Sequence, residues 1–201
     1  FCIRNHLLLH LAVVIVCRNH CPKVSQTRYA MRTDRVQNMS SSEPIDYIQR
    51  TKDQYAALNY PPYEWAYNAE PPPWQPLRKP LNDCRVALVC SGGIYAFGQI
   101  AFHHKDDNSL RLIPTDVDIK HLRTSHFAYD QTAARQDINV VFPLEPLRRA
   151  LSNGRIGTMA AAALTFMGGI YSQRKVKDQL APAIAAQLLE DEVDVAVMVP
   201  V

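Results

Sequence analysis

The segment that ends at Cys90 carries the first group of residues that could do chemistry. An apolar run over residues 85–90 predicts a short buried strand, and Ser91, Gly92 and Gly93 follow it directly. Glycines in such a turn let an anion or another backbone approach the N–H groups closely. A plain strand-ending turn is the alternative. The glycine pattern of dinucleotide-binding turns is incomplete, so a nicotinamide cofactor is not supported.

A second group of polar side chains lies in "HLRTSHFAYD", residues 121–130. This segment predicts a short strand that ends in His126, Tyr129 and Asp130, which would form a polar cluster able to hold a substrate or a proton. His126 and Cys90 are weak catalytic candidates. A lone histidine is more often structural, and a cysteine at a buried strand end is more often a small apolar residue.

Metal binding is not expected. Cys17, His20 and Cys21 lie close together, but a zinc site needs four suitably spaced ligands and no second pair is convincing. Only Cys84 and Cys90 lie beyond this segment, which is typical of a protein in a reducing cytoplasm rather than of a disulfide framework.

The charge distribution argues against nucleic-acid binding. Six of the 22 basic residues but only one of the 19 acidic residues lie within the first 38 positions. The remainder has a slight acidic excess and no basic surplus for phosphates. The apolar stretch at residues 7–16 is shorter than the roughly 20 residues that cross a bilayer, so no membrane partner is expected.

Composition divides the chain into three parts. We interpret residues 1–38 as disordered and non-native upstream sequence, with a leader peptide as the alternative, because composition shifts abruptly at Met39. Residues 39–82 predict a helix over 43–58 followed by an arm rich in proline and aromatic residues, which we expect to pack against a domain or a partner. Residues 83–201 predict the amino-terminal part of an α/β domain.

Within this domain the pattern alternates between strands and helices. Residues 103–118 look like a polar loop, 137–143 a strand or strand-like turn, and 144–154 a helix with Leu144, Leu147 and Leu151 inward. The uncharged stretch 158–171 predicts a buried strand or tight core segment. Ser172 is expected to cap a helix that Pro182 kinks or divides, and a last buried strand covers 194–201. The expected fold is a mostly parallel, flavodoxin-like or Rossmann-like sheet, incomplete at the C-terminus.

Several blocks, taken in order from about Met39 to Val201, resemble the selenoprotein B family of glycine/sarcosine/betaine reductases and D-proline reductase. They include "RVALVCSGGIY", "IPTDVDIKHLRTSHFAYD", "DINVVFPLEPLRRALSNGRIG", "LTFMGGIYSQR" and "VDVAVMVPV". The earlier blocks "EPIDYIQRTKDQYAALNYPPYEW" and "PPPWQPLRKPL" resemble the D-proline reductase-like branch.

The resemblance implies an oxidoreductase that cleaves a carbon–nitrogen bond of an amino acid, such as D-proline or glycine, with electrons from a dithiol. It implies a redox residue, selenocysteine or cysteine, directly after the segment that ends at Val201. We therefore expect a gene model truncated at a selenocysteine codon, with the fragment itself inactive. No cofactor is expected in this chain, and a pyruvoyl group on a partner subunit is implied.

On this reading Ser91, Gly92, Gly93, Tyr129, Asp130, Gly168, Gly169 and Tyr171 would line the substrate site beside the missing redox residue. The expected partners are other reductase subunits in a hetero- or homo-oligomer, a small amino acid and a thiol reductant, in the cytoplasm. Two alternatives stay open: a non-catalytic binding or assembly subunit of the same family, and a flavodoxin-like protein that binds FMN.

Overall fold

The computed structural model describes residues 12–14, 47–61, 69 and 75–201. These residues fall into two compact units. One holds helix α1 (Tyr47–Ala57), which agrees with the helix expected over 43–58 as far as the described residues reach. The other holds strand β1 (Ala12–Val14) and residues 75–201. Nearly all of the proline-rich arm lies outside the described residues.

The larger unit is built on a mixed sheet in the order β1-β8-β2-β7-β4. Its centre is parallel: β2 (Arg85–Cys90) pairs with β8 (Val195–Val199) on one side and with β7 (Ala162–Thr165) on the other. A short strand, β6 (Thr158–Met159), also runs parallel to β2. The outer strands β1 and β4 (Arg111–Pro114) are antiparallel to their neighbours. The α/β fold with a mostly parallel centre is confirmed.

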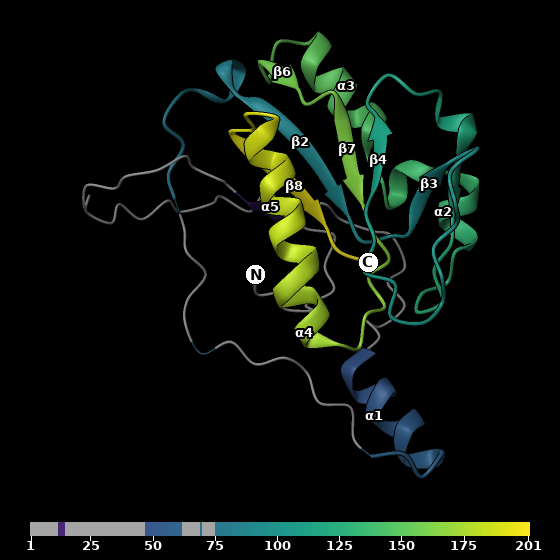
Figure 1. Cartoon of the computed structure of the whole chain (residues 1–201). Coiled ribbons are helices and arrows are strands. Elements are labelled where there is room, and N and C mark those ends of the chain that lie inside the picture. The colour runs from purple at the N-terminus through teal and green to yellow at the C-terminus, as the bar shows by residue number, and fades with distance from the viewer. Residues whose placement is uncertain (1–11, 15–46, 62–68, 70–74) are drawn as a thin grey trace, which may run out of the picture. The chain divides into compact units, whose positions relative to one another are not determined.

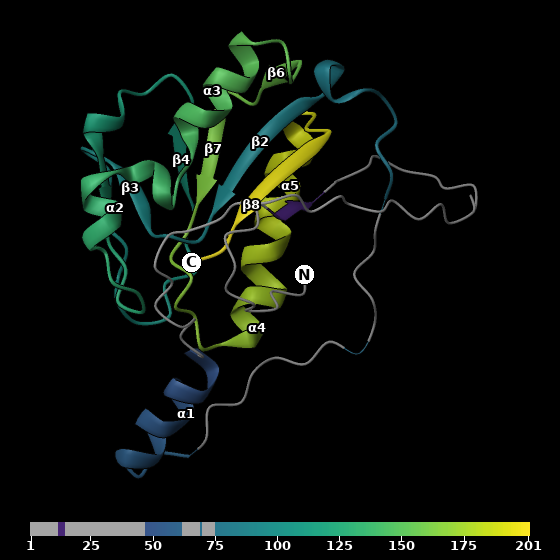
Figure 2. The same ribbon diagram turned by 180° about the vertical axis from the view of Figure 1, so that it is seen from behind.

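Both faces of this sheet are covered, as the unbroken apolar strands require. Figures 1 and 2 show α4 (Gln173–Lys175) and α5 (Ala181–Glu190) on one face. Leu180, Ile184 and Leu188 pack there against Ala87, Val89 and other sheet residues. The opposite face packs against α2 (Thr132–Gln136), α3 (Leu144–Ser152) and the small antiparallel sheet of β3 (Ile94–Ala96) and β5 (Leu122–Thr124).

The helix expected after Ser172 is present, and it is divided into segments before Pro182. Ser172 caps α4, because its hydroxyl accepts a hydrogen bond from the N–H of Lys175 (3.3 Å). The helix then widens into a π-helical turn, η4 (Val176–Leu180), before α5 begins with Pro182 in its first turn. Proline has no N–H for the bond to residue 178, and the wider turn accommodates that gap.

Two local expectations are wrong in part, and a third is decided between its alternatives. The segment 103–118 is not all loop, because β4 lies within it and buries Ile113 completely. Residues 137–143 form a turn and no strand, because Asp137 caps a 3-10 turn, η3 (Ile138–Val140), by accepting from the N–H of Asn139. Leu144 and Leu147 of α3 are buried as expected, whereas Leu151 is 38% exposed.

Two further 3-10 segments complete the description. They are η1 (Leu81–Asp83), which leads into β2, and η2 (Ile119–His121), which leads into β5. Ala12–Val14 forms a strand although we expect residues 1–38 to be disordered. The rest of that segment lies outside the described residues, so the three-part division stays a prediction.

Candidate functional site

The three parallel strands end side by side. Cys90, the last residue of β2, is in register with Thr165 of β7 and with Val199 of β8. Figure 1 shows the arrowheads of these strands pointing toward the same end of the sheet, close to the C-terminus. We call this end the carboxyl edge, formed by residues 91–93, 166–169 and 199–201 together with the loop 125–129. Open α/β sheets bind ligands at such edges.

Ser91 ties the strand ends together. Its N–H donates to the carbonyl of Val199 (3.1 Å), and its own carbonyl accepts from the N–H of Gly168 (2.8 Å). Its hydroxyl accepts from the N–H of Val201 (2.9 Å). The hydroxyl proton has no acceptor among the described residues. Ser91 is only 6% exposed, so it is a buried junction with one donor still available.

The backbone N–H groups of the glycine turn differ in whether they donate a hydrogen bond. The N–H of Gly93 donates to the carbonyl of Phe166 (3.0 Å), whereas the N–H of Gly92 donates no hydrogen bond within the described part of the chain. The sequence predicts backbone N–H groups that can point outward here. In the structure those of Ser91 and Gly93 join neighbouring strands, and that of Gly92 is left without an acceptor among the described residues.

Gly93 must be glycine. Its φ is +67°, and a Cβ atom there would collide with the carbonyl oxygen of Ser125. The same two residues are joined in the other direction, because the N–H of Ser125 donates to the carbonyl of Gly93 (2.9 Å). The absence of a side chain at Gly93 therefore brings the loop 125–129 onto the end of β2.

His126 and Tyr129 lie together in this loop, with ring centroids 4.7 Å apart. Asp130 does not join them. It is exposed, and its Oδ1 accepts from the N–H (2.9 Å) and the hydroxyl (2.6 Å) of Thr132 at the start of α2. These bonds lower the pKa of Asp130. The predicted polar cluster is thus a histidine–tyrosine pair, with the carboxylate directed to a helix terminus.

The hydroxyl of Tyr129 belongs to a small network that sequence reasoning missed in part. The carbonyl oxygen of Gly92 lies 3.0 Å from Tyr129 Oη and 3.1 Å from Thr124 Oγ1, and these two hydroxyl oxygens are 3.0 Å apart. Two hydroxyl protons serve three contacts, so at most two are hydrogen bonds at one time. Burial raises the pKa of Tyr129, while Thr124 and Arg135 act in the opposite direction.

The environment of His126 keeps the imidazole neutral. Burial lowers its pKa from 6.5 to about 4. Its Nδ1 accepts a hydrogen bond from the N–H of Ala128 (3.0 Å), so the single proton of the neutral ring is on Nε2. That Nε2 is buried and has no partner among the described residues.

The second glycine pair lies against the same structures. A Cβ at Gly168 would be 3.0 Å from the Cβ of Ser91, and a Cβ at Gly169 would be 2.6 Å from Cζ of Phe127. The rings of Phe127 and Tyr171 are stacked with centroids 6.3 Å apart. Phe127 and Thr124 were not singled out from the sequence. The aromatic residue directly after His126 and the hydroxyl at the end of β5 were the available signals.

Cys90 is fully buried in the core, and burial raises the pKa of its thiol well above the ordinary value. Because the thiolate is the nucleophile, this environment favours the structural role over the catalytic one. Among the described residues no three histidine, cysteine or acidic side chains are grouped so as to hold a metal ion. Cys17, His20 and Cys21 lie outside them.

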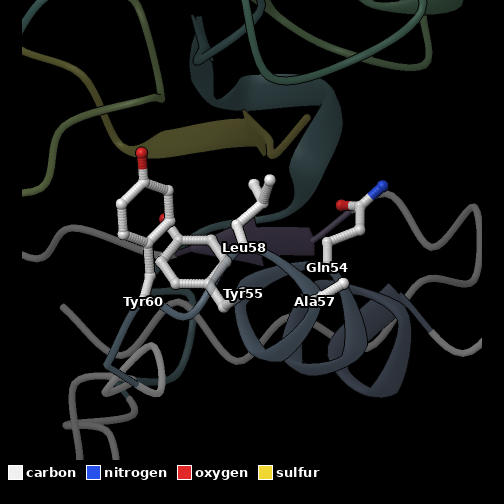
Figure 3. Close-up of a pocket in the computed structure, with 5 residues that line it drawn as sticks. All are labelled: Gln54, Tyr55, Ala57, Leu58 and Tyr60. Carbon is white, nitrogen blue, oxygen red and sulfur yellow. The ribbon is translucent and has the colours of Figure 1, made fainter.

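A shallow hollow occurs on the smaller unit, lined by Gln54, Tyr55, Ala57, Leu58 and Tyr60 (Figure 3). All of these belong to α1 or the turn after it, and most are exposed. The hollow brings no set of catalytic or charged side chains together. None of the helices in the described part of the chain has both the length and the apolar character needed to cross a bilayer.

Comparison with known proteins assigns the family. The family model of glycine/sarcosine/betaine reductase selenoprotein B matches residues 59–201. The D-proline reductase subunit gamma of Acetoanaerobium sticklandii is 37% identical over 128 residues, which cover 64% of this chain and 53% of the relative. The chain thus spans about half of the length of this curated relative. No solved structure matches it. The chain belongs to the glycine/sarcosine/betaine reductase selenoprotein B family.

Proposed function

We propose that the chain is part of a reductase subunit that reductively cleaves a carbon–nitrogen bond of a small amino acid such as D-proline. Support comes from the family match over residues 59–201 and from the name of the relative, D-proline reductase subunit gamma. The observation that carries the proposal within the fold is the meeting of three strand ends around Ser91. The subunit would act with other reductase subunits in the cytoplasm, and a partner subunit would carry the pyruvoyl group.

The reaction consumes two electrons and two protons. The carbon–nitrogen bond breaks, a carbon–hydrogen and a nitrogen–hydrogen bond form, and a dithiol is oxidised to a disulfide. An ionised selenol supplies reactivity that a thiol with a pKa of about 8.5 lacks at neutral pH. In the proposal this redox residue directly follows Val201 in the full-length protein.

The carboxyl edge suits such a residue. The N–H of Val201 is fixed by the Ser91 hydroxyl, and a Cγ atom of Val201 lies 3.4 Å from the position of a Cβ at Gly92. The Ser91 hydroxyl and the Gly92 N–H are donors without acceptors among the described residues. Donors in this position stabilise an anion, whether a chalcogen anion or a substrate carboxylate.

The other predicted site residues have supporting roles in this proposal. Gly93 brings the loop 125–129 close, and Tyr129 orients the Gly92 carbonyl. Gly168 allows the strand ends to approach Ser91, and Gly169 and Tyr171 contact or stack on Phe127 at the rim of the edge. Asp130 would contribute only by accepting hydrogen bonds from Thr132 at the start of α2.

The test is an assay of the full-length protein with its partner subunits, a dithiol and D-proline, glycine, sarcosine or betaine in separate reactions. We expect thiol-dependent appearance of the ring-opened 5-amino acid from D-proline, or release of the amine from another substrate. Replacing the residue after Val201 by alanine should abolish the reaction. Thiol-independent turnover, or full activity of that variant, would refute the proposed function.

A further inference from the structure

The loop 125–129 holds a buried donor that bonds to none of the described residues. His126 is 8% exposed, and its Nε2 is buried without a partner among the described residues. Leaving a buried polar group unpaired costs about 1–3 kcal/mol, so native proteins rarely keep one without a reason. The Ser91 hydroxyl and the Gly92 amide, in the turn next to Gly93, are also without acceptors among the described residues.

The orientation of the ring is determined by its other nitrogen. The N–H of Ala128 donates to Nδ1 (3.0 Å), and this bond selects the tautomer with the proton on Nε2. The rings of Tyr129 and Phe127 pack against the imidazole at centroid distances of 4.7 and 5.9 Å. Gln131 donates to the backbone carbonyl of His126. The imidazole is therefore held in place by several neighbours.

The Cβ of His126 lies beside the glycine turn. A Cβ at Gly93 would be 3.4 Å from it, and Tyr129, whose ring contacts the imidazole, has its hydroxyl 3.0 Å from the carbonyl oxygen of Gly92. The closest ionisable side chain in ring contact is Tyr129, and burial is the cause of the lowered pKa of His126. At neutral pH the imidazolium form is not populated, so the ring does not act as a general acid. The neutral ring can still donate a hydrogen bond.

We propose that His126 Nε2–H, together with the Ser91 hydroxyl and the Gly92 N–H, binds the carboxylate of the small amino acid at the carboxyl edge. This inference rests on the proposed function for the choice of ligand. His126 is a neutral donor that positions the carboxylate, and it is not the group that transfers a proton. An uncharged donor in a partly apolar site binds an anion without introducing a buried positive charge.

The first experiment needs no variant. Full-length protein labelled with ¹⁵N-histidine is examined by NMR at pH 7 and titrated with acetate, with D-proline and with D-prolinamide. We expect the ligand-free ring of His126 to be protonated at Nε2. The chemical shift of this nitrogen should change when acetate or D-proline is added, but not when D-prolinamide is added. A ring protonated at Nδ1, no movement with either carboxylate, or equal movement with the amide would overturn the proposal.

Two variants separate the ligand bond from the loop bond. His126→Asn places an oxygen where Nδ1 accepts from Ala128 but removes the distal donor, whereas His126→Gln keeps a distal N–H. We expect the affinity for D-proline or acetate to fall about 10- to 100-fold in His126→Asn and clearly less in His126→Gln. The control is His104→Asn, at an exposed histidine, which should leave affinity unchanged. Unchanged affinity in a folded His126→Asn protein would overturn the proposal.

The outcomes distinguish this inference from the proposed function. If acetate moves the His126 resonance but no amino acid is reduced, the site stands and the proposed reaction fails. If D-proline is reduced equally well by wild type and His126→Asn, the reaction stands and the site fails. A variant with serine after Val201 tests the other anion at this edge. Carboxylate binding should persist in it and the ligand-free His126 Nε2 resonance should stay where it is, whereas a change of that ligand-free resonance would assign the Nε2–H bond to the redox residue instead.

Discussion

The two ends of the parallel strands are built from opposite kinds of polar groups. At the amino end, Asp194 Oδ2 accepts from the N–H of Arg85 (2.7 Å) and lies 2.7 Å from the Lys79 ammonium. Arg85 Nη1 donates to the carbonyl of Asp191 (2.8 Å). Burial would raise the pKa of Asp194, but the bonds from Lys79 and Arg85 outweigh it and lower the pKa.

The carboxyl end carries uncharged donors that have no acceptor within the described part of the chain. Ser91, Gly92 and His126 each have one, and the lowered pKa of His126 is caused by burial. One exception occurs at the amino end, where Asp191 Oδ2 is buried without a partner among the same residues while Oδ1 accepts from Gln187. Charges paired with one another stabilise the fold, whereas unpaired donors next to a glycine turn are available to a ligand.

The largest effect should come from Gly93→Ala at the carboxyl end. The substitution combines an unfavourable positive φ with a collision against Ser125, so we expect a loss of at least ~3 kcal/mol in the free energy of unfolding. Urea denaturation measures it. Gly154→Ala is the matched control, because its φ is +65° and nothing lies within 4 Å of the new Cβ. It should cost only about 1–2 kcal/mol. Equal losses would show that Ser125 does not pack closely on the turn.

Asp194→Ala tests the amino end. It removes the Lys79 pair and the acceptor of the Arg85 N–H, and should lower the free energy of unfolding by about 1–2 kcal/mol. The reductase activity of the folded protein should not change. Asp178→Ala, at an exposed carboxylate on η4, should change stability by less than about 0.5 kcal/mol. A specific loss of activity in Asp194→Ala would contradict the division between the two ends.

Acid should weaken the carboxyl end through His126. Its pKa is about 4 in the folded protein and close to the ordinary 6.5 when unfolded, so the unfolded chain binds more protons between these values. The stabilising contribution is complete above pH 6.5 and is lost as the pH falls toward 4. Between pH 7 and pH 5 we expect the free energy of unfolding to fall by about 1 kcal/mol, a value that allows for partial screening by solvent. In thermal melts, the melting temperature of His126→Asn should fall less than that of the wild type over this interval. An equal fall in both proteins would assign the acid sensitivity to other groups.

Tyr129→Phe should have the smallest effect, about 0.5 kcal/mol, because Thr124 can still donate to the Gly92 carbonyl. Thr124→Val should cost a similar amount for the same reason. The double variant leaves that carbonyl without either donor, so its loss should exceed the sum of the single losses by at least ~0.5 kcal/mol. Additive losses in a double-mutant cycle would show that the two hydroxyls act independently.

Much of the carboxyl edge was predictable because it is encoded locally. The apolar run 85–90 predicts a buried strand whatever its neighbours, and Ser91 with two glycines predicts the turn. The polar residues around β4 misled prediction, because the short apolar pair Leu112 and Ile113 lies between polar segments and the strand is stabilised by pairing with β7. Asp137 likewise directs its segment into η3 through a local side-chain bond, where the apolar pattern suggests a strand.

The site itself was only partly predictable. His126 and Tyr129 were singled out by their residue types. Residue type alone does not show that the carboxylate of Asp130 bonds to Thr132 at the start of α2 and not to a ligand. Phe127 and Thr124 became relevant only through contacts with residues more than 30 positions away, Gly169 and Gly92.

By itself the sequence determined the central strands that end at Cys90 and Val199 and the position of the glycine turns, because periodicity and turn chemistry act over a few neighbouring residues. Its motifs, taken in order along the chain, carried the family resemblance. Tertiary structure alone decided that Ser91 meets Val201, 110 positions later, and that the ring of His126 is buried with its proton on Nε2. Strand order and burial depend on contacts between distant segments, and those contacts place the unpaired donors at one end of the sheet and the paired charges at the other.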